Sequence, residues 1–256
     1  MPLRTLTKNE VERIRLILST YQDGSGMLHQ KSGLTLPGWR DFERTVAIVF
    51  GGEAQENKDI FDVLVQKMEN ASIKFGISCK MRRELNKLEK TGRVYFELSN
   101  SAGYFWKQLK SRGITPKNYL KKPAVVGKTL IDLVESWHYA VSTKCGETVN
   151  LNESCYFVLS WNKKGFYQLH QFAIHMPKPK SLKWHFPTPR CLRGDDQHGT
   201  LFEWYGESGG QLKYYPLAKS AQWHPEIFSL EPIKDIKGGM LTKVATYFPE
   251  LWKKVN

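Results

Sequence analysis

Two short segments near residue 70 constrain the fold more than any other part of this chain of 256 residues. From 73 to 79 the odd positions are all apolar and the even positions are polar or small, which is the period-two pattern of a strand with one face in the core. Residues 61–65 are rich in β-branched and aromatic side chains and end in a polar turn. The two segments therefore predict neighbouring strands joined as a hairpin.

This hairpin would carry an acid on one strand and a lysine on the other. Asp62 lies where the first strand begins, and Ser78 and Lys80 lie on the polar face of the second. A carboxylate and an amine on adjacent strands can hold a divalent cation beside a scissile phosphate. The same residue types also occur in α/β proteins in purely structural roles, so the pattern indicates a nuclease site without excluding a structural one.

The spacing of Asp62, Ser78 and Lys80 resembles the catalytic motif of the PD-(D/E)XK nucleases, the superfamily that holds most type II restriction endonucleases. The resemblance implies an α/β (α+β) fold with a mixed central sheet flanked by helices. It also implies a Mg²⁺ cofactor and a Lys80 that positions the attacking water. The chain departs from the motif at Ser78, where the family has Asp or Glu, because a neutral hydroxyl is a weak ligand for magnesium.

A second carboxylate would then come from another part of the chain. The candidates, in order of preference, are Glu97, Glu43, Glu84 and Glu89. Glu97 lies in a predicted third strand, and Glu43 lies in a predicted helix that ends at a Gly-Gly pair. The resemblance implies that Asp62 binds Mg²⁺ together with the backbone carbonyl of Cys79 and the carboxylate of Glu97 or Glu43.

The charge of the chain favours a polyanionic partner. Lys and Arg number 38 against 25 Asp and Glu, which gives a formal net charge of +13. The basic residues that we expect near DNA phosphates are Arg82, Arg83, Lys163, Lys164, Lys178, Lys180, Arg190 and Arg193. The expected substrate is double-stranded DNA, and the two-fold symmetry of palindromic sites favours a homodimer. A cognate methyltransferase in the same restriction system would not need to contact this chain.

The order of predicted elements suggests two parts. A nuclease core with N-terminal helices would cover residues 1–145, and a β-rich DNA-recognition lobe would cover 146–256, although one continuous domain is also compatible with the pattern. Further helices are predicted after Thr7, from Ser99 and over 129–140, and hairpins over 156–175 and 201–215. Residues 123–129 end like a phosphate-binding loop, but Lys122 stands where that motif has its first glycine.

Several other classes of protein are disfavoured. No apolar run approaches the length of a spanning helix, so no membrane partner is expected. The first residues are polar rather than secretory, and the four cysteines are scattered without a zinc pattern. We therefore expect a cytoplasmic protein with reduced cysteines.

Two alternative functions follow from the same sequence. In one, the chain is a non-catalytic basic DNA- or RNA-binding protein in which Asp62, Ser78 and Lys80 are structural. In the other, the chain is an HNH-like nuclease whose metal is held by His185, His198 and His224.

Overall fold

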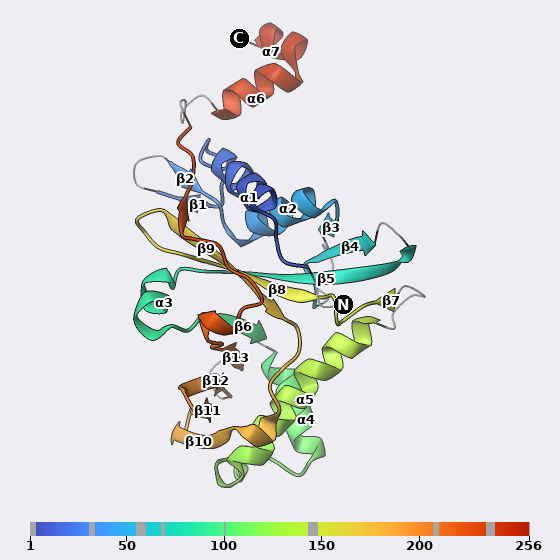
Figure 1. The fold of residues 1–256 in the computed structure, drawn as a ribbon, viewed down its shortest axis with the longest axis vertical. Coiled ribbons are helices and arrows are strands. Elements are labelled where there is room, and N and C mark those ends of the chain that lie inside the picture. The colour runs from blue at the N-terminus through green and yellow to red at the C-terminus, as the bar shows by residue number, and fades with distance from the viewer. Residues whose placement is uncertain are drawn as a thin grey trace.

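The fold is that of a computed structural model, which describes residues 4–30, 34–54, 60–67, 70–99, 101–142, 148–206, 210–233 and 239–255. These residues form two main β-sheets with helices packed around them (Figure 1). No helix in these ranges is both long enough and apolar enough to cross a bilayer.

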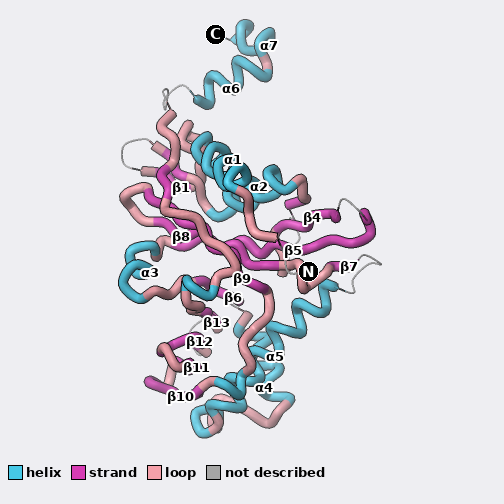
Figure 2. The backbone as a smooth tube through the Cα atoms, viewed as in Figure 1, coloured by secondary structure: helices cyan, strands magenta, loops and turns pink. Residues whose placement is uncertain are grey.

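A seven-stranded mixed sheet lies at the centre of the molecule (Figures 1 and 2). Its strands, in order of pairing, are β14 (Phe228–Ser229), β9 (Phe166–Ala173), β8 (Cys155–Trp161), β5 (Asn70–Arg82), β4 (Val63–Lys67) and β3 (Glu53–Ala54), with β7 (Thr148–Val149) also paired to β5. β5 runs parallel to β8 and β7, and the other pairs are antiparallel. The expected mixed central sheet flanked by helices is confirmed, as is the hairpin of β4 and β5.

The central sheet separates two groups of elements. α1 (Lys8–Thr20) and α2 (Trp39–Phe50) lie on one face of it (Figure 1). α4 (Ala102–Ser111), α5 (Pro123–Ser142) and a second, antiparallel sheet lie on the other. The strands of this five-stranded sheet pair in the order β10 (Lys183–Thr188), β11 (Cys191–Asp196), β12 (Gly199–Tyr205), β13 (Gln211–Tyr214) and β6 (Phe96–Ser99).

The side chains of β8 point alternately into two hydrophobic cores, one on each face of the central sheet. Cys155, Phe157 and Leu159 pack with the apolar faces of α1 and α2. Tyr156 and Val158 pack with α4, α5 and the five-stranded sheet. A strand covered on both faces needs no polar face, and in neighbouring β5 the polar residues Lys74 and Ser78 are buried as well, with Ser78 only 2% exposed.

Capping residues set the ends of the first two helices as the sequence predicts. Thr7 and Glu10 form a reciprocal capping box at the start of α1. α2 ends at Gly51, whose φ of 63° is in the left-handed region that favours glycine. Gly51 thus ends α2, the helix that carries Glu43.

Two predicted boundaries differ from the structure, and a third is not tested by it. Ser99 belongs to β6 rather than capping the next helix, which begins after Ser101. α5 begins at Pro123, so the segment that resembles a phosphate-binding loop is helical. The expected seam at 145 lies outside the described residues, and strands from both sides of it occur in each main sheet.

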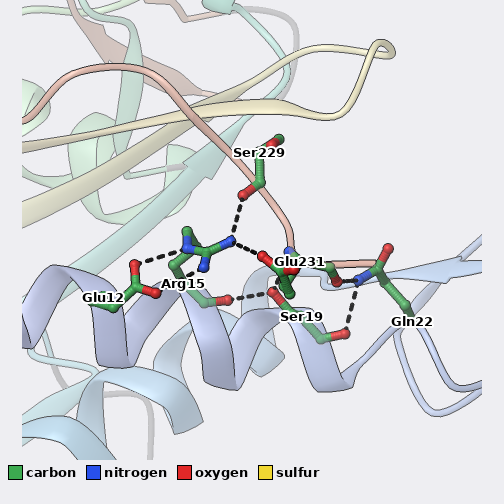
Figure 3. Close-up of polar contacts among 6 residues, drawn as sticks. All are labelled: Glu12, Arg15, Ser19, Gln22, Ser229 and Glu231. Carbon is green, nitrogen blue, oxygen red and sulfur yellow. Dashed lines mark hydrogen bonds and ion pairs between the residues drawn. The ribbon is translucent and has the colours of Figure 1, made fainter. Parts of the chain in front are cut away.

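The segment after β14 is held against α1 by polar contacts (Figure 3). Arg15 forms an ion pair with Glu231 at 2.9 Å, and the backbone amide of Glu231 donates to Ser19 Oγ at 2.8 Å. The two short helices α6 (Gly239–Tyr247) and α7 (Pro249–Val255) follow and lie beyond α1, at one end of the molecule (Figure 1). The C-terminal part of the chain therefore returns to the N-terminal helix.

Gly76 is the position in β5 where an added methyl group should disturb the fold most. An alanine Cβ would lie 2.2 Å from the ring of Phe61, beside Asp62. We expect Gly76→Ala to lower the free energy of unfolding by about 1–3 kcal/mol, measured by urea denaturation. Gly103→Ala in α4 is the control, because its methyl group would meet no atom within 4 Å. Equal stability of the two variants would contradict the packing described here.

Candidate functional site

The candidate site lies where β5 extends past the end of β4. The ladder between the two strands stops at Val63, which pairs with Ile77, whereas β5 continues to Arg82. In place of a strand partner, Asp62 Oδ2 accepts a hydrogen bond from the backbone amide of Cys79 at 2.7 Å. The N–H and C=O of one residue leave a strand on the same side. The carbonyl of Cys79 therefore also faces the edge at which Asp62 lies.

Ser78 and Lys80 bring their side chains to the same carboxylate. Ser78 Oγ donates to Asp62 Oδ2 at 3.3 Å, and Lys80 Nζ lies 3.6 Å from that oxygen. The side chains of Asp62 and Lys80 are each 23% exposed, so the pair is accessible to solvent on one side only. Positions 78 and 80 share a face of the strand, which is why both reach Asp62.

Glu43 is the candidate carboxylate that is electrostatically coupled to this cluster. Its pKa is raised from 4.5 to about 7, first by burial and then by the negative charge of Asp62, against the opposing charges of Lys80, Arg40 and Arg44. α2 carries Glu43 over the face of the sheet opposite to Lys80. Two carboxylates whose charges repel are a common arrangement in cation sites, because a bound cation removes the repulsion.

The other three glutamates have different surroundings. Glu97 accepts from Arg82 Nη2 at 2.9 Å and lies on β6, in the other sheet. Glu84 pairs with Lys87 at the start of α3 (Leu85–Thr91), and Glu89 is exposed on that helix. Glu97 and Glu84 are thus each paired with a basic side chain of their own.

A cleft of about 580 Å³ opens beside Asp62, Ser78 and Lys80. Its opposite wall comes from α4, α5 and the end of β6, and includes Tyr104, Trp137 and His138. His138 is 3% exposed and its Nε2 lies 3.0 Å from the hydroxyl of Tyr156. Burial, followed by the charges of His175 and Lys80, lowers the pKa of His138 to about 4, so the ring is neutral at pH 7.

The sequence carries a signal for His138 that is a helical spacing rather than a catalytic motif. Leu130, Val134 and His138 follow one another at intervals of four, so the histidine lies on the buried face of its helix. A titratable residue on an apolar helical face marks either a satisfied core group or a site. Here it lines the same cleft as Lys80.

The basic residues expected to contact DNA fall on several elements. Arg82 and Arg83 line a hollow next to the end of β5. Arg193 donates from Nε to Glu203 at 2.8 Å on the five-stranded sheet. The remaining five are exposed in turns: Lys163 and Lys164 between β8 and β9, Lys178 and Lys180 before β10, and Arg190 between β10 and β11.

The histidines of the alternative metal site have separate partners. His185 contacts Asp195 at 2.8 Å, His198 contacts Gln197, and the ring of His224 stacks on His170. In the part of the chain that the structure describes, no three His, Cys, Asp or Glu residues gather as a metal-binding group. Cys79, Cys155 and Cys191 are free and buried, and Cys145 lies outside the described residues.

Comparison with protein-family models, with curated proteins and with solved structures finds no match to this chain. The geometry around Asp62 is therefore the basis on which a function can be inferred.

The raised pKa of Glu43 predicts a pH-dependent stability. Between 4.5 and about 7 the folded protein binds more protons than the unfolded chain, so the free energy of unfolding falls as the pH rises through this window. We expect a loss of roughly 1–2 kcal/mol, discounted for solvent screening. Urea denaturation in chelator at acidic and at mildly alkaline pH would measure it.

Glu43→Gln should remove this loss, and Glu89→Gln, an equal change of charge on α3, should keep it. An unchanged pH dependence in Glu43→Gln would show that this carboxyl does not carry the coupling.

Proposed function

We propose that this chain is a magnesium-dependent endonuclease that hydrolyses double-stranded DNA, as type II restriction enzymes do. The observation that carries the proposal is the convergence of Ser78 Oγ, the Cys79 amide and Lys80 Nζ on one carboxylate of Asp62 at an open sheet edge. A PD-(D/E)XK nuclease fold is part of the proposal, and the mixed central sheet flanked by helices is compatible with it.

The residues present fit a magnesium ion. Magnesium prefers oxygen ligands and is commonly held by one or two carboxylates, with water and substrate phosphate in the remaining positions. Asp62, the carbonyl of Cys79 and Glu43 would supply the protein oxygens, and the repulsion between the two carboxylates supports this set. The ion, when bound, would offset charge on the scissile phosphate and lower the pKa of a water molecule.

The other groups of the site have roles that follow from their positions. Lys80, released from Asp62 by the cation, would donate a hydrogen bond that orients the attacking water and would offset negative charge at the phosphate. Ser78 would hold the carboxylate of Asp62 by its hydrogen bond. The buried, neutral His138 would line the cleft without adding charge to it.

The excess of basic residues supports a polyanionic substrate, since each phosphate contact releases counterions. A palindromic site has two-fold symmetry, which matches two active sites related by the same symmetry, so the proposed functional form is a homodimer. The same two-fold axis would then relate both the two recognition surfaces and the two active sites.

Asp62→Asn and Lys80→Ala should each lower the rate of plasmid cleavage in magnesium by at least about 100-fold, because each removes a group that acts on the reacting phosphate. DNA binding in chelator should be retained, and cleavage by the wild type should stop in chelator. The assay is agarose electrophoresis of varied plasmid and phage DNA, followed by sequencing of fragment ends.

Asp132→Asn and Lys110→Ala are matched controls, because Asp132 forms exposed ion pairs with Arg112 and Lys128, and Lys110 is exposed at the end of α4. Both should cut at the wild-type rate. Wild-type cleavage by Asp62→Asn, or no cleavage by any form across the DNA panel, would favour the non-catalytic DNA- or RNA-binding protein.

Glu43 and Glu97 are distinguished by a magnesium titration of the cleavage rate. Glu43→Gln should raise the magnesium concentration for the half-maximal rate by about tenfold or more, because it removes a ligand. Glu97→Gln should leave that concentration close to the wild-type value, because its carboxylate pairs with Arg82. The reverse ranking would assign the second carboxylate to Glu97.

A further inference from the structure

The five-stranded sheet has one apolar and one polar face. Its apolar face, with Trp184, Phe202 and Trp204, belongs to a hydrophobic core. On the other face the strand registers align one polar residue from each strand, in the order His185, Arg193, Glu203, Lys213 and Glu97. This polar row crosses the whole sheet.

The polar row ends beside the candidate catalytic residues. Glu97 pairs with Arg82, which is two residues beyond Lys80 on the same face of β5, so the Cα atoms of these two basic residues are separated by roughly 7 Å along the strand. A nucleic acid strand that follows the row would therefore reach Lys80.

Three tyrosine rings lie near this end of the polar row, and each is held by a hydrogen bond or by stacking. Glu203, 7% exposed, accepts hydrogen bonds from the hydroxyl groups of Tyr205 at 3.0 Å and Tyr215 at 2.6 Å. The ring of Tyr95 stacks on Tyr215, with 5.2 Å between centroids. Lys213 Nζ lies over both Tyr95, at 5.7 Å, and Tyr205, at 4.4 Å. Aromatic rings and cations are thus combined on one rigid platform.

Two hollows flank this platform, and Tyr95 and Glu84 line both of them. The hollow of about 420 Å³ is also lined by Lys87, Arg93 and Lys213, and the one of about 570 Å³ by Arg82 and Arg83. Volumes of this size are in the range of sites for small ligands. Arg82 Cζ and Lys213 Nζ lie over the Tyr95 ring, 5.3 Å and 5.7 Å from its centroid. A nucleotide base that stacks on this ring would displace one of these cations, which would then pair with the phosphates of the nucleotide.

We propose that Tyr95 and the two hollows beside it form a binding site for one unpaired nucleotide of the DNA substrate. A paired base is stacked inside the duplex and cannot reach the ring, so the nucleotide must leave the helix, which is easiest where it has no partner. This inference rests on the proposed function, since it says that the same enzyme binds double-stranded DNA with one nucleotide out of the helix.

The test compares two short labelled duplexes in chelator, one with a single unpaired nucleotide at its centre and one fully paired. Fluorescence anisotropy should show that the wild type prefers the first duplex by about tenfold, the size expected for stacking of one base. Tyr95→Ala should abolish this preference, Tyr95→Phe should keep it because the ring remains, and Lys110→Ala should keep it as the control.

Equal affinity of the wild type for both duplexes would overturn the inference, as would a folded Tyr95→Ala that keeps the preference. Tyr95→Leu, which keeps an apolar side chain but removes the ring, gives the same test if Tyr95→Ala fails to fold: it should lose the preference, and retention would count against the site. Binding is measured in chelator and so does not depend on cleavage. A loss of the preference would therefore not count against the Asp62 site, and a failure of cleavage would not prevent measurement of the preference.

Discussion

The hydrogen bond from the backbone of Cys79 to Asp62 is the interaction on which the rest of the site depends. β5 runs past the end of β4, and the carboxylate occupies the position that the next residue of a longer strand would fill. A negative charge is thereby held at an open edge, between α2 on one face of the sheet and Lys80 on the other. The same stretch of β5 then leads through Arg82 to the polar face of the second sheet.

In the proposed function a cation binds at this edge of the sheet. Without one, Lys80 offsets Asp62, and the second carboxyl, Glu43, is held near half protonation at neutral pH by burial and by Asp62. A divalent cation would replace both the lysine and the proton, leaving Lys80 free to act on the substrate. In the proposed function, binding of the metal would recover the stability that the fold loses when Glu43 ionises.

Local sequence patterns predicted much of this arrangement. The features that depend on pairing between strands far apart in the sequence could not be predicted from them. The alternation of apolar and polar residues predicted β5, and the spacing from Asp62 predicted that Ser78 and Lys80 meet it. Both predictions depend only on strands that are neighbours in the sequence. The choice between Glu97 and Glu43 was beyond such patterns. β6 follows the β4–β5 hairpin in the chain but pairs with β13, which comes more than a hundred residues later. This pairing places Glu97 beside Arg82. The polar row was equally hidden, since it exists only once five strands are in register.

The most direct measurement is a crystal structure of the protein with duplex DNA and calcium, which scatters anomalously. The account predicts an anomalous peak about 2.3–2.6 Å from an oxygen of Asp62 and from the carbonyl of Cys79, beside a DNA phosphate. Glu43 should complete the ligand set, and Lys80 should have moved from Asp62 to the phosphate or its water. A complex in which Asp62 stays paired with Lys80, with DNA bound and no cation at this edge, would contradict the account.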